Sequence, residues 1–115
     1  MAPKTASFMN GVPELLILRL LRDREMYGYE IVQAIRQETG EVVSIGEGVA
    51  YPILHALERS GAITSRRLTV GGRSRIYYAL SETGGSRLGE LTALWSGLTG
   101  AVGTVLAGGR HVSAV

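Results

Sequence analysis

The last third of the chain carries an apolar repeat of the kind by which helices pack against one another. Its members recur at alternating spacings of three and four residues, which places them on one face of a helix over about 82–107. They are Leu88, Leu91, Trp95, Leu98, Val102 and Val105. Glycines interrupt this helix, and each costs about 1 kcal/mol relative to alanine, so the helix is not expected to be stable alone. The repeat therefore predicts a partner helix, most economically from a second copy of the chain.

The composition excludes several classes of protein. Its 115 residues suit one domain, and 45% hydrophobic with 19% charged residues is enough to form a core. The absence of cysteine excludes disulfide scaffolds, thiolate zinc sites and cysteine nucleophiles. No apolar run reaches the roughly 18 residues of a membrane span, and the N-terminal segment lacks the core of a signal peptide. We therefore expect a cytoplasmic protein without a cofactor, a metal ion or a membrane partner.

Three helices are expected in the first half of the chain. Pro13-Glu14 is typical of a helix start, and a dense leucine and isoleucine pattern continues to about Arg24. A second helix is expected over about 27–39, where Gly40 is placed as its C-terminal stop. A third helix is expected over 47–60.

The third helix has distinct ends and faces. Gly46 or Ser44 can cap it, and the spacing of Ser44 from Glu47 resembles a capping box. Pro52 removes one backbone hydrogen bond and is expected to bend the first turns. The apolar positions share one face and are Ala50, Ile53, Leu54 and Leu57.

A basic hairpin follows the helices. The segments 62–70 and 73–80 are strand-like, and Gly71-Gly72 between them suits a tight hairpin turn. Residues 59–115 carry seven basic and two acidic groups, a net charge of +5. Residues 1–58 carry five basic and eight acidic groups, a net charge of −3. The overall charge of +2 therefore conceals a basic half, in which four arginines flank the turn: Arg66, Arg67, Arg73 and Arg75. A cluster of guanidinium groups can neutralise phosphates.

The order helix–helix–helix–hairpin is that of a winged helix-turn-helix. We therefore expect a mainly α fold with a two-stranded β wing, followed by a long C-terminal dimerisation helix. Residues 1–80 are assigned to the winged helix-turn-helix domain, including an N-terminal arm over 1–11. Residues 81–107 are assigned to the dimerisation helix and 108–115 to a flexible tail.

Several segments of this chain occur in an order and spacing that resemble a known family. They read ELLIL at 14–18, YGYEI at 27–31, EGVAYPILHALE at 47–58, GAI at 61–63 and RIYYALSETG at 75–84. Together they resemble the PadR-type transcriptional regulators over about residues 12–106, in particular the small members with one C-terminal helix. The resemblance implies a homodimer that binds a palindromic DNA operator, usually as a repressor relieved by a small-molecule effector.

In a helix-turn-helix the second helix of the motif enters the major groove. The DNA-binding candidates on the expected third helix are Gly48, Val49, Tyr51, Pro52, His55 and Arg59, and the hairpin adds Arg66, Arg67, Arg73 and Arg75. Gly48 permits close backbone approach, while His55 and Arg59 can reach base edges or the backbone. The arginines of the wing are expected at phosphates or in the minor groove. Alanine at Arg73 and Arg75 should then weaken operator binding and flatten its salt dependence.

Several candidates also have a plainly structural interpretation. His55 can be a solvent-facing histidine, and Tyr51 can pack at the junction of two helices instead of contacting DNA. Trp95 can serve dimer packing alone, or two symmetry-related copies can flank a cavity that stacks a planar aromatic effector. In the second case Trp95 is the effector-binding residue. The remaining tyrosines are interpreted as core and strand residues: Tyr27, Tyr29, Tyr77 and Tyr78.

Other functions are weighed against this interpretation. An enzyme is disfavoured because His55 and His111 are the only histidines, and the P-loop, dinucleotide-binding and metalloprotease motifs are missing. A winged-helix module that binds protein instead of DNA, and a winged-helix regulator of another family, are the alternatives. DNA binding weakens steeply with salt, whereas a largely apolar protein interface does not. Salt dependence therefore separates a DNA-binding regulator from a protein-interaction module.

Overall fold

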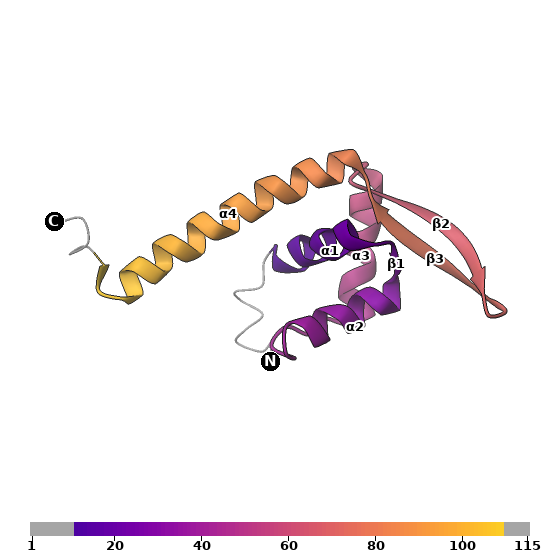
Figure 1. The fold of residues 1–115 in the computed structure, drawn as a ribbon, viewed down its shortest axis with the longest axis horizontal. Helices are drawn as coiled ribbons and strands as arrows, with labels where there is room; N and C mark the ends of the chain where they lie inside the picture. The colour runs from indigo at the N-terminus through magenta and orange to yellow at the C-terminus, as the bar shows by residue number, and fades with distance from the viewer. Residues whose placement is uncertain (1–10, 110–115) are drawn as a thin grey trace.

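The computed structural model describes residues 11–109, which form four helices and three strands (Figure 1). In chain order they are α1 (Val12–Asp23), β1 (Met26–Tyr27), α2 (Gly28–Glu38), α3 (Glu47–Arg59), β2 (Ile63–Val70), β3 (Arg73–Leu80) and α4 (Glu82–Leu106). Most of the expected N-terminal arm (1–11) and of the expected tail (108–115) lies outside the described residues.

The predicted fold class, a mainly helical winged helix-turn-helix, is confirmed, with one correction to the wing. The sheet has three strands in the order β1-β3-β2, not two. The added strand, β1, pairs antiparallel with β3 through Met26↔Tyr78 and Tyr27↔Tyr77. Two residues are too few to show a periodic pattern, so only their pairing with β3 identifies them as a strand.

The core lies where the first three helices meet the inner face of the sheet. Its fully buried side chains are Ile17, Leu18, Ile31, Ile35, Leu54 and Ile63. The expected apolar face of α3 is confirmed, since Ala50, Leu54 and Leu57 are buried and Ile53 is half-buried. The interpretation of Tyr29 as a core residue is wrong, because 51% of this residue is exposed at the start of α2.

The expected capping box at the start of α3 is also wrong. Gly46 is the N-cap, its carbonyl oxygen accepts hydrogen bonds from the N–H groups of Val49 (3.1 Å) and Ala50 (3.0 Å), and no side chain caps the helix. Ser44 lies two residues before the cap and is exposed. A comparable side-chain contact instead forms at α2, where the Glu30 carboxylate accepts from the N–H of Tyr27 at 3.1 Å.

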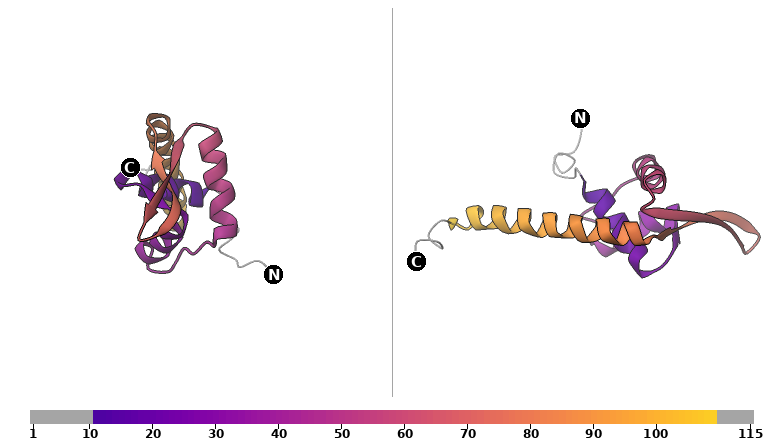
Figure 2. Two further views of the ribbon diagram at one scale, coloured as in Figure 1. Left: turned by 90° about the vertical axis from the view of Figure 1, so that its right-hand side faces the viewer. Right: turned by 90° about the horizontal axis from the view of Figure 1, so that it is seen from above.

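The last helix leaves the domain in the direction opposite to the hairpin (Figures 1 and 2). Ser81 caps α4 as expected, and its Oγ accepts from the N–H of Gly84 at 3.1 Å. The same hydroxyl donates to the carbonyl oxygen of Gly61 at 2.5 Å. The radius of gyration is 16.9 Å, against about 13 Å for a compact chain of this length, because the C-terminal part of α4 projects beyond the other elements (Figure 1).

Candidate nucleic-acid interface

One face of α3 is open to solvent along most of its length. Five of the six candidates on this helix are exposed: Gly48, Val49, Pro52, His55 and Arg59. No heavy atom lies within 4 Å of the position that a Cβ on Gly48 would take, so another molecule can approach the backbone there. The start of α3 has no side-chain cap, and its uncapped N–H groups with the helix dipole favour an anion. This face can therefore receive an acidic surface.

Tyr51, the sixth candidate, is half-buried at the junction of α2 and α3. A Cβ on Gly28, the first residue of α2, would lie 2.6 Å from Cζ of Tyr51, so the ring rests directly on this glycine. Burial raises the pKa of Tyr51, and the nearby carboxylate of Glu47 raises it further. The hydroxyl therefore stays protonated as a donor. The structure favours the packing interpretation of this residue.

The hairpin turn places the four arginines on the two long strands of the wing. Gly71 and Gly72 have φ values of +57° and +78°, which is the left-handed geometry that a tight turn needs. Arg66 and Arg67 lie on β2, and Arg73 and Arg75 lie on β3.

The contacts of these arginines differ. The Nε of Arg66 donates to Oε2 of Glu25 at 3.1 Å, and its Nη2 donates to Oε1 of the same carboxylate. The guanidinium carbon of Arg75 lies 4.4 Å from the ring centre of Tyr27. Sequence reasoning missed both partners. The Glu25 contact spans 41 residues, and no local pattern indicates it.

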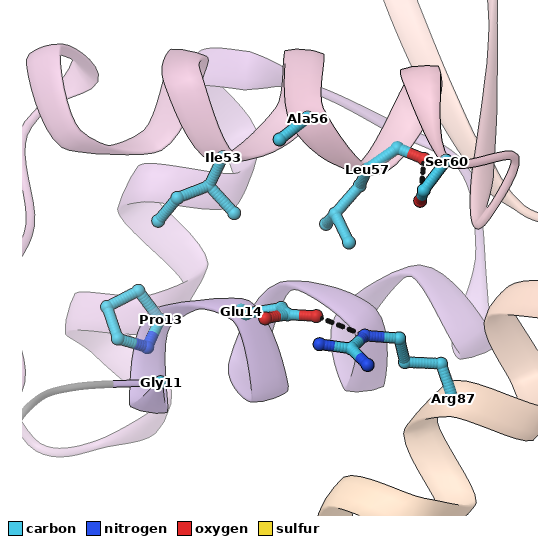
Figure 3. A pocket seen from close by; sticks show the side chains of 8 residues that line it. All are labelled: Gly11, Pro13, Glu14, Ile53, Ala56, Leu57, Ser60 and Arg87. Carbon is cyan, nitrogen blue, oxygen red and sulfur yellow. Dashed lines mark hydrogen bonds and ion pairs between the residues drawn. The ribbon is translucent and has the colours of Figure 1, made fainter.

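A recess lies between α1, α3 and the start of α4 (Figure 3). Its volume is about 590 Å³, and it is lined by Gly11, Pro13, Glu14, Ile53, Ala56, Leu57, Ser60 and Arg87. The Nε of Arg87 donates to Oε2 of Glu14 at 2.5 Å across this recess. This pair raises the pKa of Arg87 and ties the first turns of α4 to α1.

The apolar repeat of α4 forms a continuous seam that has two different environments. The residues of this seam are Leu88, Leu91, Trp95, Leu98, Val102 and Val105. Leu88 is buried in the core and Leu91 packs against it, so the first turns of the seam are covered by the chain itself. From Trp95 onward the seam is exposed, with exposed fractions of 44% for Trp95, 60% for Leu98 and 75% for Val105. A recess of about 160 Å³ beside Trp95 is lined by Gly11, Val12, Leu15, Leu91, Leu94, Trp95 and Leu98.

Residues 11–109 contain neither a membrane-spanning helix nor a metal-binding cluster. None of the helices described there has both the length and the apolar character needed to cross a membrane. Within the same range, no three histidine or carboxylate side chains gather closely enough to hold a metal ion.

An exposed helix face beside a basic hairpin, both mounted on a three-helix core, defines a winged helix-turn-helix protein. Residues 17–90 match the sequence profile described as the transcriptional regulator PadR-like family, and the chain belongs to this family. The resemblance recognised in the sequence is thereby confirmed. The family is one of transcriptional regulators, in agreement with the expectation that this chain is not an enzyme.

Relatives and solved structures support the same assignment. The transcriptional regulator Rv3488 of Mycobacterium tuberculosis is 31% identical over 72% of this chain and 75% of its own length. The crystal structure of a PadR-family regulator from Eggerthella lenta matches with a TM-score of 0.78 and 28% identity, covering 89% of this chain and 88% of that chain. Bacillus subtilis PadR in complex with operator DNA matches with a TM-score of 0.65 and 32% identity, covering 70% of this chain and 45% of that chain.

Proposed function

We propose that this regulator binds double-stranded DNA as a homodimer and represses transcription from a palindromic operator until a small-molecule effector releases it. The observation that carries the DNA-binding part is the open face of α3 beside the arginine hairpin. The similarity to Bacillus subtilis PadR, whose structure was determined with operator DNA, supports the same interpretation.

In this proposal α3 enters the major groove and the hairpin lies over the flanking backbone or minor groove. The open backbone at Gly48 lets the uncapped start of α3 approach a phosphate. Val49 contacts a thymine methyl group, and Arg59 and His55 reach base edges. Pro52 lies on the same exposed face, and Tyr51 holds α3 against α2.

The proposed homodimer uses the part of the α4 seam that the chain leaves uncovered. Val102 and Val105 lie on it with Trp95 and Leu98, and burying such side chains contributes about 25 cal/mol per Å² of apolar surface. A second copy supplies the same seam, which a two-fold axis brings face to face. Two copies of α3 then read half-sites about one helical turn, roughly 34 Å, apart.

Trp95 is the proposed effector-binding residue. Its ring lies beside the recess of about 160 Å³ that α4 forms with the start of α1, and 44% of the residue is exposed. In a dimer two such rings flank the axis and can stack a planar aromatic molecule. Titration of the homodimer with planar drugs and phenolic acids should quench the fluorescence of this single tryptophan. Unchanged fluorescence across such a set would remove Trp95 from the site.

The DNA-binding proposal is tested by selecting bound sequences from a random DNA pool with the purified protein. A palindromic motif with half-sites about one turn apart is expected. Affinity for the selected duplex is then measured against salt, where each lost phosphate contact lowers the slope by about 0.9. The double variant Arg73→Ala/Arg75→Ala should flatten this dependence, and Arg19→Ala, an exposed arginine on α1 paired with Asp23, is the matched control. Absence of sequence enrichment would favour the protein-interaction module instead.

A further inference from the structure

The four arginines of the wing lie on different faces of the sheet. Residues paired across antiparallel strands point to the same face, so the register Arg66↔Tyr77↔Tyr27 puts these three side chains in one row. Arg75 and Arg73 share their face because they are two and four residues from Tyr77 on the same strand. Arg67 follows Arg66 directly and therefore points to the opposite face.

On the first face, aromatic and acidic neighbours already hold the guanidinium groups of Arg66 and Arg75. Glu25 accepts two hydrogen bonds from Arg66, which is the forked geometry that makes arginine–carboxylate pairs specific. Arg75 lies over the ring of Tyr27, and that ring meets the ring of Tyr77 edge-on at 5.4 Å. These five side chains link β1 to both long strands of the wing.

The opposite face belongs to the side on which α3 lies. Ser65, two residues before Arg67 on β2, donates from Oγ to Oε2 of Glu58 on α3 at 2.5 Å. Arg67 itself donates from Nη1 to the hydroxyl oxygen of Ser74 at 3.0 Å. A neutral hydroxyl leaves the positive charge of Arg67 uncompensated. Arg73 lies on the first face with Arg75, but it stands beside the turn, where it is exposed, and within residues 11–109 its side chain forms no ion pair.

We propose that the four wing arginines divide by role: Arg66 and Arg75, held by Glu25 and Tyr27, position the wing against β1, whereas Arg67 and Arg73 contact DNA phosphates. This division rests on the proposed DNA binding and narrows the set of four arginines that the sequence offers. Glu25 and Tyr27 become positioning residues of the interface.

The charge balance explains why Arg66 is a poor phosphate ligand. DNA binding gains affinity when a cation displaces counterions from phosphates. The pair of Arg66 with Glu25 carries no net charge, so it displaces none. If Arg66 left the pair for a phosphate, the carboxylate of Glu25 would remain beside the wing and repel the DNA. The hydrogen bond from Arg66 holds the pKa of Glu25 below its usual value, so this carboxylate is ionised at neutral pH.

The first test measures the salt dependence of affinity for the selected duplex with four single variants. Arg67→Ala and Arg73→Ala should each lower the slope of log affinity against log salt by about 0.9. Arg66→Ala removes a charge that Glu25 already neutralises, so it should lower the affinity and leave the slope at the wild-type value. Arg75→Ala removes the contact with the Tyr27 ring and should lower the affinity. All four side chains reach the surface, so circular dichroism and thermal unfolding should confirm that each variant folds, with Arg19→Ala as the control for lost charge.

The second test exchanges the charges of the pair. Glu25→Arg combined with Arg66→Glu restores the ion pair with its partners reversed, while Arg66→Glu alone places two carboxylates together. The exchanged double variant should recover most of the affinity that the single variant loses, with the wild-type salt slope. A phosphate ligand cannot be replaced by glutamate, so continued loss of binding in the double variant would overturn the role of Arg66.

The outcomes also separate this division from the proposed function. A wild-type protein that enriches no duplex overturns DNA binding and the division with it. A wild-type protein that binds DNA, with slopes that fall equally for Arg66→Ala and Arg67→Ala, overturns the division alone. Hydrogen exchange of the free protein gives a readout without DNA: amides of β1 and β3 should exchange faster in Arg66→Ala and at the wild-type rate in Arg67→Ala.

Discussion

Gly84 lies in the first turn of α4, where its Cα packs against the carbonyl group of Ala62. A Cβ at this position would overlap the backbone oxygen of Ala62 and lie 2.6 Å from Cδ1 of Leu80. The oxygen cannot move aside easily, because it accepts a hydrogen bond from the N–H of Ser81 at 3.0 Å. Gly84→Ala therefore forces α4 away from the start of β2, although alanine is the better helix former.

The size of the effect follows from opposing contributions. Gly→Ala within a helix gains about 1 kcal/mol of helix propensity. Overpacking against a rigid neighbour costs about 2 kcal/mol. Displacing α4 also weakens the hydrogen bonds of Ser81 to Ala62 and Gly61, at about 1 kcal/mol each. The net loss is about 3 kcal/mol, which lowers the Tm by roughly 10 °C in a domain of this size.

The neighbouring glycine supplies a matched control. No heavy atom lies within 4 Å of a Cβ on Gly85, so Gly85→Ala gains the propensity without the overlap and raises stability by about 0.5–1 kcal/mol. The assay is urea denaturation followed by circular dichroism, at equal protein concentration for all three proteins. If Gly84→Ala were as stable as Gly85→Ala, the argument from the Ala62 contact would be refuted.

Three further predictions test other contacts. Gly28→Ala should lower stability by about 1–2 kcal/mol because its Cβ meets the Tyr51 ring, and thermal unfolding should show that this cost largely disappears in a Tyr51→Ala background. Glu25 has a pKa lowered below its usual 4.5 by Arg66, so its ion pair stabilises the fold above that pH and is lost as the pH falls through the lowered pKa. The Tm difference between wild type and Glu25→Gln should accordingly shrink in acid, and an undiminished difference would count against the pair. Leu98→Asp, at a residue 60% exposed, should give a folded monomer by light scattering, whereas a monomeric wild type would contradict the proposed dimer.

Local patterns are sufficient to predict the helices and the hairpin of this chain. The spacing of apolar residues, the glycine pair at the turn and Ser81 each have a cause within a few neighbouring residues. The strand β1 has no such cause, since Met26 and Tyr27 form a strand only because β3 lies beside them. The Ser44 capping box was a wrong prediction for a related reason: the spacing fits, but the chain enters α3 through Gly46.

The candidate interface shows the same limit for individual side chains. The four arginines flank one turn in the sequence, so the sequence alone predicts the same role for all of them. Their faces on the sheet depend on register, and the contact of Arg66 with Glu25 depends on β1 being paired with β3. Both are properties of the folded sheet, so no window of the sequence contains them.

The α4 seam shows how one periodic pattern can serve two partners. Periodicity identifies the apolar face of a helix but not what covers it. Here Leu88 and Leu91 pack against the chain's own core, and only the stretch from Trp95 to Val105 is left for a second copy. At 1.5 Å per residue that stretch is about 15 Å long, short for a stable interface of roughly 1,200 Å² or more. In the proposed dimer the start of α1, whose Val12 and Leu15 line the recess beside Trp95, must therefore add to the buried surface. The proposed effector recess and the proposed dimer interface then share residues, so we expect an effector bound at Trp95 to change the spacing of the two α3 helices in that dimer.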